Sequence, residues 1–430
     1  MITNRFWQNT IQVQKSYRNP FLWVPTLYLA EGLPYFIVNT ISIIVLKDLG
    51  MANGPLALMT SLISLPWMIK PLWSPFVDIF RSKRWWVLAT QFLMVASVAV
   101  LALTLPKSSP FTITLILFVI TGFTSATHDI SADGFYMLAM DDRWQSGMIG
   151  VRNTFYRIAM VLGQGVLVVV AGILEKRSGD VCRAWTLTLL VASGILAILA
   201  LYHLFILPKP AGDAMQSGKT AKHVAREFGS AFSSFFAKDG VWFMIAFMLL
   251  FRLPEAFSVK MLYPFFADDV AAGGLGLDKS SFGLVYGTAG VIALLAGGIL
   301  GGVLISRWDL RRCMMPMALS LALPCAVYLF MAVMQPQSLG VIGACVVFDQ
   351  FGYGFGFTAY TVYMMRFSQG PMKTSHFAIC TGFMALSMLL PGLVAGYLQT
   401  MLGYVGFFIL VMLCCLATIF VSFSARRRLQ

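Results

Sequence analysis

The sequence predicts an all-α membrane protein with twelve transmembrane helices, arranged as two six-helix halves. Of its 430 residues, 58% are hydrophobic and 11% are charged, whereas an average soluble protein carries roughly 25% charged residues. The mean hydropathy is +0.79. Twelve helices of about 20 residues use about 240 positions, which leaves room for short loops and one longer connection.

Apolar runs separated by turn and charge signals define the twelve expected helices. In the first half they cover 20–46, 54–78, 85–105, 110–140, 147–174 and 184–207. In the second half they cover 239–267, 279–305, 312–334, 338–366, 374–400 and 404–424. We therefore expect an N-terminal domain at 1–207, a cytoplasmic linker at 208–238, which is the long polar segment, and a C-terminal domain at 239–430.

Lys and Arg are distributed unequally between the two sides of this predicted bundle. If the N-terminus is inside, the inner segments carry twenty Lys and Arg residues and the outer segments carry six. Loops that stay in the cytoplasm are enriched in these bases, so both termini are expected there. Topology thus accounts for the net charge of +13. The bases form no stripe interleaved with aromatic residues, so no nucleic-acid partner is expected.

The cysteines give no sign of a metal or redox site. All seven lie singly or as the adjacent pair Cys414 and Cys415, mostly inside apolar runs. There is no Cys-x-x-Cys motif and no histidine cluster at metal-ligand spacing. We expect small core residues, no metal and no cofactor.

The two predicted halves show a faint internal similarity. Glu31 and Pro34 in the first span correspond to Pro254 and Glu255 in the seventh. The fourth and tenth spans each carry an acid near their middle. Two parallel six-helix repeats are the architecture of the major facilitator superfamily, in which the substrate binds at the midplane between the halves.

Two loops resemble the signature of that superfamily, an acid at the end of a span followed by a short basic loop. Charge pairs at such helix ends can hold one alternating-access state closed. We therefore expect a gating motif formed by Asp78, Arg81, Lys83 and Arg84 after the second span, and by Asp309, Arg311 and Arg312 after the eighth.

Acids inside the spans are the candidates for proton coupling. A carboxylate near the bilayer centre costs roughly 2.5–3.5 kcal/mol on insertion scales, so such groups face a protein interior or a polar path. Asp129 and Asp133 are four residues apart and share one helical face. With Glu31 they are predicted to exchange protons. His128 is added as a relay because imidazole titrates near neutral pH; the alternative is a hydrogen-bonded neighbour of the acids.

The bases inside the spans are the candidates for substrate binding. Arg157 and Arg252 are expected to anchor an anionic substrate, because guanidinium presents a planar fork to carboxylates and phosphates. Arg152 points in another direction from Arg157, five residues away, and Arg157 is the one expected at the cavity. Lys70 and Lys260 belong to the same set of charges inside the spans; they can pair with acids in a polar cavity, but because they lie close to span ends, extension to the surface is the favoured alternative. The predicted substrate site is completed by Glu255, Asp349, Tyr156 and Tyr353.

Several stretches resemble the AmpG-type muropeptide permeases, a facilitator branch of bacterial inner membranes: Lys70-Pro-Leu-Trp73-Ser-Pro-Phe-Val-Asp78, Ser125-Ala-Thr-His-Asp129-Ile-Ser-Ala-Asp133 and Tyr156-Arg157. The resemblance implies proton-driven import of N-acetylglucosaminyl-anhydro-N-acetylmuramyl peptides. It also implies roles for the paired acids of the fourth span and for Arg157. The chain departs from the family pattern at His128, where the family has Gln.

Alternatives to this function stay open. Related branches resemble these permeases but carry other cargo, such as siderophores or acyl-CoA-type compounds. A membrane enzyme that uses adjacent His128 and Asp129 as a general base is the alternative from another class, but internal repetition argues against it and no enzyme is expected. We expect a monomer in the lipid bilayer that handles a small-molecule substrate and protons.

Overall fold

The structure, a computed structural model, describes residues 18–105, 110–140, 142–210, 213, 221–370 and 372–429. All regular structure in these ranges is helical. Nine apolar helical stretches within these described ranges are long enough to cross a membrane, and two of them, Lys279–Met334 and Ser375–Arg428, have 56 and 54 residues. Each of these two breaks once, at Asp309 (φ 65°) and at Gly403 (φ 67°). Because these two stretches supply two spans each, the nine stretches give eleven spans. The segment 53–79, which is divided into short helices, is the remaining one of the twelve spans that the sequence predicts.

The first half contains six spans, close to the predicted ranges. The first span is α2 (Val24–Phe36), the π-helical turn η2 (Ile37–Ile41) and α3 (Ser42–Asp48), and the second is α4 (Asn53–Ile63), α5 (Leu65–Ile69) and α6 (Ser74–Ile79). The others are α7 (Lys83–Thr104), α8 (Pro110–Ala139), α9 (Asp142–Met160) with η4 (Val161–Val166) and α10 (Leu167–Ser178), and α11 (Val181–Ile206).

The second half repeats this arrangement after a connecting helix, α12 (Ala221–Phe236). Its seventh span is α13 (Val241–Leu250) and α14 (Leu253–Ala267). The remaining spans are formed by α15 (Lys279–Leu284), η7 (Val285–Gly290), α16 (Val291–Ala322), α17 (Ala326–Met334), α18 (Leu339–Phe367) and α19 (Lys373–Arg428). The domain and linker boundaries expected at 207 and 238 stay a prediction.

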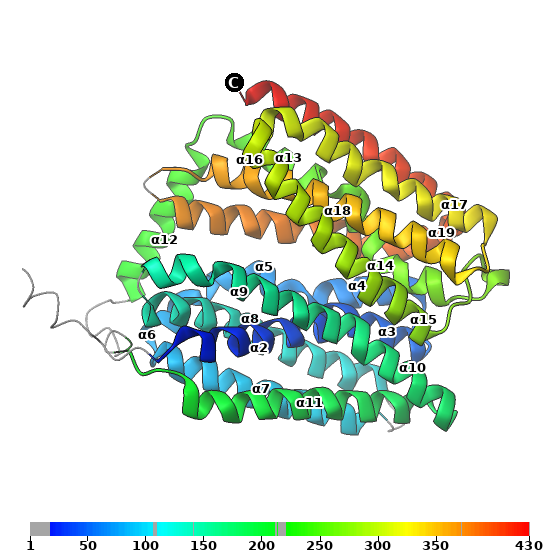
Figure 1. Cartoon of the computed structure of the whole chain (residues 1–430), viewed down its shortest axis with the longest axis horizontal. Helices are drawn as coiled ribbons and strands as arrows, with labels where there is room; N and C mark the ends of the chain where they lie inside the picture. The colour runs from blue at the N-terminus through cyan, green and yellow to red at the C-terminus, as the bar shows by residue number, and fades with distance from the viewer. Residues whose placement is uncertain are drawn as a thin grey trace, which may run out of the picture.

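Figure 1 shows the two halves lying one above the other, with the blue to green helices below and the yellow to red helices above. The linker end carries α6, α12 and the beginning of α19, and the far end carries α15 and the end of α10. In the connecting segment, α12 contacts both α6 and α19 and so bridges the halves at the linker end.

The halves meet along a few helices. α14 packs against α3 and α4, α19 against α4 and α5, α10 against α15, and η4 against η7. The last crossing requires glycine: a Cβ on Gly287 would lie 1.9 Å from the backbone oxygen of Gln164. Small residues allow such close approach of helix backbones in membrane proteins. The contacts of α10 with α15 bring the halves together at the far end.

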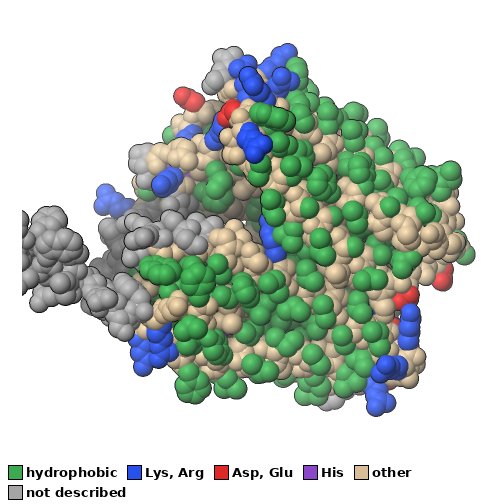
Figure 2. Space-filling view, in the orientation of Figure 1, with side chains coloured by type: hydrophobic (Ala, Val, Ile, Leu, Met, Phe, Trp, Pro, Cys, Tyr) green, Lys and Arg blue, Asp and Glu red, His purple; other side chains and the backbone are tan. Residues whose placement is uncertain are grey.

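Hydrophobic side chains cover much of the visible surface between the two ends (Figure 2). Large apolar residues are exposed on several spans, among them Ile198, Phe205, Trp242 and Phe420, each about 70% exposed (69%, 72%, 73% and 71%). Lipid rather than water is the solvent in which such a surface is stable.

Candidate functional site: a charged cavity between the halves

A cavity of about 610 Å³ lies between the two halves. The first half contributes side chains from α2, α5, α8 and α9, and the second from α14, η7, α18 and α19. This volume is in the range of small-molecule sites, about 300–1,000 Å³. Among the residues that the structure describes, no three His, Cys, Asp or Glu side chains converge as metal ligands.

Asp129 on α8 is the first acid of the cavity. Trp67 Nε1 donates a hydrogen bond to its Oδ2 at 2.9 Å, and Lys70 Nζ lies 3.7 Å from the same atom. Its other oxygen, Oδ1, is buried and has no hydrogen-bond partner in the described part of the chain. One carboxylate oxygen is therefore held in place while the other is free to take a proton.

One helical turn further along α8, Asp133 forms a second acid–base pair. Arg152 Nη2 lies 2.8 Å from its Oδ1, and Tyr28 donates a hydrogen bond to the same oxygen at 3.0 Å. The Arg152 guanidinium also lies over the Tyr28 ring, 4.4 Å from its centre, a favourable cation–π geometry. Nearby Glu31 is buried, and its Oε2 has no partner among the described residues.

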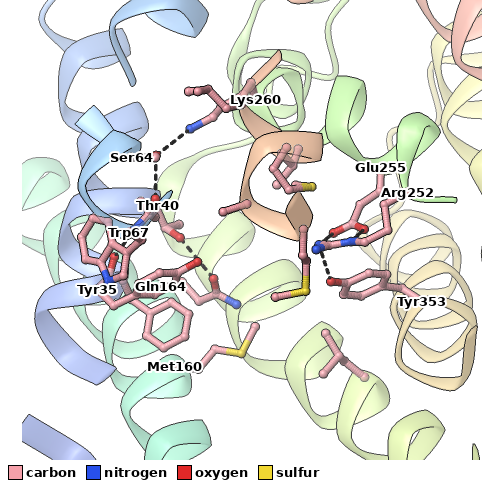
Figure 3. Close-up of a pocket in the computed structure, with 18 of the residues that line it drawn as sticks. Tyr35, Thr40, Ser64, Trp67, Met160, Gln164, Arg252, Glu255, Lys260 and Tyr353 are labelled. Carbon is pink, nitrogen blue, oxygen red and sulfur yellow. Dashed lines mark hydrogen bonds and ion pairs between the residues drawn. The ribbon is translucent and has the colours of Figure 1, made fainter. Parts of the chain in front are cut away.

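The second half supplies a closed pair of its own, at the beginning of α14. Arg252 donates from Nε and Nη2 to the two oxygens of Glu255 at 2.9 and 2.8 Å, and from Nη2 to the Tyr353 hydroxyl at 2.9 Å (Figure 3). Bidentate pairs of this kind are the stronger charge-assisted hydrogen bonds. On α18, Asp349 Oδ2 accepts from Tyr328 at 2.7 Å and from Gln350 at 3.1 Å.

Of the ten residues predicted for proton coupling and substrate binding, eight line this cavity and two, His128 and Arg157, do not. Arg157 is half-buried but does not line the cavity; the arginine of α9 that does is Arg152. Five residues rotate an α-helix by about 140° from its starting direction, so one of the two had to point elsewhere. The predicted residues that line the cavity are Glu31, Asp129, Asp133, Tyr156, Arg252, Glu255, Asp349 and Tyr353.

His128 lies inside the first half, outside the residues that line the cavity. Gln91 connects it to a second buried histidine: Gln91 Nε2 is 3.0 Å from His128 Nε2, and Gln91 Oε1 is 3.0 Å from His203 Nδ1. An amide that donates at one end and accepts at the other suits two neutral imidazoles. The hydrogen bond of His128 is thus to an amide and not to one of the acids, and the relay role stays a prediction.

Sequence reasoning favoured the surface for Lys70 and Lys260 over the cavity, and the structure places both at the cavity. Lys70 turns inward because Asp129 lies within reach. Trp67 was not singled out at all; it follows Pro66 in the broken second span, and no pattern in the sequence marks it as a partner of an acid.

Ion pairs between the two halves close the far end. Lys279 Nζ on α15 lies 2.8 Å from Asp48 Oδ2 and also contacts Glu175 at the end of α10. A second pair joins Lys47 to Asp268 at 2.7 Å, and a third joins Lys176 to Asp278 at 3.1 Å. Each pair has one member in each half. The sequence did not predict them as a set.

The predicted gating motif lies at the linker end. Lys83 and Arg84 donate their backbone N–H groups to the Asp213 carboxylate at 2.6 and 3.0 Å, and Arg84 Nη2 donates to the Leu204 carbonyl at 2.7 Å. These contacts fix the beginning of α7 and the end of α11. The side chain of Asp78 is outside the described residues.

In the second half the corresponding loop has its own contacts. Asp309 accepts from the Arg366 guanidinium and from the Arg311 N–H. The side chains of Arg81, Arg311 and Arg312 are exposed. The contacts described for Arg84 and Asp309 each stay on one side of the boundary between halves, and the gating role of the motif stays a prediction.

Comparisons with known proteins agree with this architecture. A family model described as Major Facilitator Superfamily matches residues 26–369. The anhydromuropeptide permease of Escherichia coli strain K12 is 25% identical over 394 residues, covering 88% of this chain and 74% of the permease. A Rickettsia conorii protein named putative transporter AmpG 4 is 23% identical over 409 residues, covering 92% of this chain and 94% of that protein.

A similar fold is found among solved structures. The nucleoside transporter NupG aligns with a TM-score of 0.70 and 15% identity, covering 95% of this chain and 98% of NupG. At this identity the likeness concerns the fold alone.

Proposed function

Because the chain belongs to the major facilitator superfamily, we propose that it is a proton-coupled transporter that imports an anhydromuropeptide, or a related anionic amino-sugar solute, across the bacterial inner membrane. The observation that carries the proposal is the cavity between the halves, with acid–base pairs in its lining and two buried carboxylate oxygens that have no partner among the described residues. The cavity is formed by one chain, so we propose that the monomer is the working unit.

Asp129 is the proposed site of proton uptake. Trp67 donates to one oxygen, and the other has no partner in the part of the chain that the structure describes, so the carboxylate can gain a proton without losing the tryptophan hydrogen bond. Protonation would remove its attraction for Lys70, and deprotonation would restore it. Glu31 and Asp133 lie in the same cluster and complete the proposed proton-coupling set, since neighbouring acids favour proton sharing.

The far-end ion pairs support a direction for transport. We propose that the linker end faces the cytoplasm, because loops rich in Lys and Arg are retained there. The far end then faces the periplasm and is closed by Lys279, Lys47 and their partners. On this view the structure represents the state from which cargo leaves toward the cytoplasm, and the pairs would separate when the cavity opens to the outside.

The cargo assignment rests on the named relative and on the cavity lining. The E. coli protein that is 25% identical carries the name anhydromuropeptide permease. The cavity presents charges of both signs beside Tyr35, Trp67 and Tyr156, which suits a solute with an apolar sugar face and ionised groups. Aromatic side chains offer such faces, and a few polar groups fix orientation.

Uptake into vesicles tests the proposal. Purified protein is reconstituted, an acid-outside pH gradient is imposed, and accumulation of labelled anhydromuropeptide is measured with and without a protonophore. We expect accumulation that collapses with the protonophore. No uptake of this cargo, while a siderophore or an acyl-CoA compound is taken up, would reject the cargo. Accumulation that is the same with and without the pH gradient would contradict proton coupling.

A further inference from the structure

We infer that Lys260 binds an anionic group of the cargo, such as a peptide carboxylate, and that it makes the cavity selective for a negatively charged solute. The inference rests on the proposed function and adds to it the residue that recognises cargo charge. Lys260 belongs to α14, is buried with 7% exposure, and lines the cavity.

Lys260 differs from the other cations that line the cavity. Lys70 has Asp129, Arg152 has Asp133 and Arg252 has Glu255 as a partner. Lys260 makes no ion pair with any acid in the part of the chain that the structure describes, and its Nζ contacts neutral oxygens instead. A buried charge without a counter-ion is costly. An anion entering the cavity would meet a cation whose charge is not yet compensated.

The present partners of Lys260 belong to the other half of the molecule. Its Nζ lies 3.1 Å from the backbone oxygen of Thr60. It also lies 3.5 Å from Ser64 Oγ, and this second contact is the one drawn in Figure 3. α4 ends at this point: the Ser64 N–H bonds to the Ser61 oxygen and not to that of Thr60. The freed Thr60 carbonyl accepts from Ser64 Oγ at 2.9 Å as well as from Lys260.

A carboxylate would compete well for this ammonium group. The C-terminus of a helix carries a partial negative charge of about half a unit, whereas a carboxylate carries a full one. The bond from Lys260 to Thr60 has one charged member, whereas a bond to a carboxylate has two and adds a direct attraction between opposite charges. We therefore expect a carboxylate of the cargo to replace Thr60 as the hydrogen-bond partner of Lys260, which would also break a contact between the two halves.

The test compares two cargoes in the same vesicles: anhydromuropeptide, and the same compound with its peptide carboxyl groups amidated. A hydrogen bond to a charged group contributes about 1.5–3 kcal/mol, so wild-type protein should prefer the carboxylate form by about tenfold or more. In Lys260→Gln this preference, measured as the ratio of the two uptake efficiencies, should fall to about one.

Lys238→Gln is the matched control. Lys238 also donates to helix-end carbonyls, those of Phe367 at 2.6 Å and Gln369 at 2.8 Å, but it lies outside the cavity. This variant should keep the wild-type preference. Wild-type protein that takes up both cargoes equally would overturn the inference without any variant, as would equal losses for both cargoes in Lys260→Gln. Uptake of neither cargo by wild-type protein would reject the proposed cargo itself.

Discussion

At the scale of single residues, three of the four described cations that line the cavity are paired with acids, because the membrane interior gives an isolated charge little solvation. The Arg252–Glu255 pair of the second half is the most enclosed of these three pairs, with side-chain exposures of 8% and 20%. Breaking a buried pair by removing one partner typically costs about 3–5 kcal/mol, whereas replacing both partners by apolar groups is often neutral. A single substitution that leaves one charge unpaired therefore tests stability, whereas a double substitution that removes both charges tests whether transport needs the pair itself.

We expect Glu255→Gln to be markedly destabilised, because Arg252 would keep its charge and lose its counter-ion. The loss should approach about 3–5 kcal/mol, measured as a lower midpoint of thermal unfolding in detergent. The double variant Arg252→Met and Glu255→Met should regain most of that stability and still fail to transport. If the double variant is less stable than Glu255→Gln, the two side chains stabilise the fold by more than neutralising each other's charge.

The sequence predicted which charges are buried better than it predicted where each one points. Hydropathy and spacing identified the acids of α8 and the pair at the beginning of α14. They could not choose between Arg152 and Arg157, because the choice depends on how α9 is rotated against its neighbours. Lys260 was misplaced for a similar reason: a lysine near a span end can extend to the surface or turn inward, and the direction is set by the freed carbonyl on α4.

At the scale of helices, the contact between η4 and η7 brings two backbones together through glycine. We expect Gly287→Val to disturb this contact strongly, because a Cβ there would lie 1.9 Å from the Gln164 oxygen. Overpacking typically costs about 1–3 kcal/mol, enough to lower uptake by about tenfold. The control is Gly302→Val on the neighbouring α16, where an added Cβ meets nothing within 4 Å. Equal uptake by the two variants would contradict the account.

The buried ion pair of Lys279 is expected to hold the far end closed. In Lys279→Gln, Asp48 and Glu175 lose their shared cation, and the two halves should separate more often at that end. Spin labels on the exposed residues Ala52 and Ala271 should then show a longer or broader distance distribution by electron–electron double resonance.

Lys176→Gln provides the comparison for that measurement. Its pair with Asp278 also joins the halves but is exposed, at 61% and 41%, and exposed pairs contribute about 0–1 kcal/mol. This variant should keep the wild-type distances. Unchanged distances in Lys279→Gln as well would show that packing, not charge, closes the far end.

Three π-helical turns in the described part of the chain lie at the cavity. η2 places Asn39 and Thr40 at the cavity, η4 places Gln164 there and η7 places Tyr286. Such turns are frequent at functional sites. No sequence pattern predicted them, since apolar periodicity does not separate a π-helical turn from the α-helix on either side.

At the scale of the whole molecule, the twelve spans and their order follow from hydropathy, because membrane helices must be long and apolar to satisfy their backbone in lipid. The sequence did not predict the ion pairs that join the two halves at the far end. Asp48, Glu175 and Lys279 lie in three separate spans, and each resembles an ordinary loop charge until the helices are packed. Long-range pairing of this kind is a property of the assembled halves.

Topology can be tested independently of transport. In a background without the native cysteines, Ala271→Cys at the far end should react with a membrane-impermeant maleimide added to spheroplasts, and Gln369→Cys at the linker end should not. Both residues are exposed, so accessibility across the membrane is what the comparison measures. The reverse pattern would invert the proposed orientation and with it the proposed direction of transport.

The central claim is that protons and cargo use the same cavity through the acids of α8. The most direct measurement is the pH dependence of anhydromuropeptide uptake by Asp129→Asn and Asp133→Asn variants present in the membrane at wild-type amounts. The account predicts that Asp129→Asn abolishes gradient-driven accumulation, and that Asp133→Asn, which leaves Arg152 unpaired, also impairs it. Uptake in both variants that matches wild type and responds to pH in the same way would contradict the account.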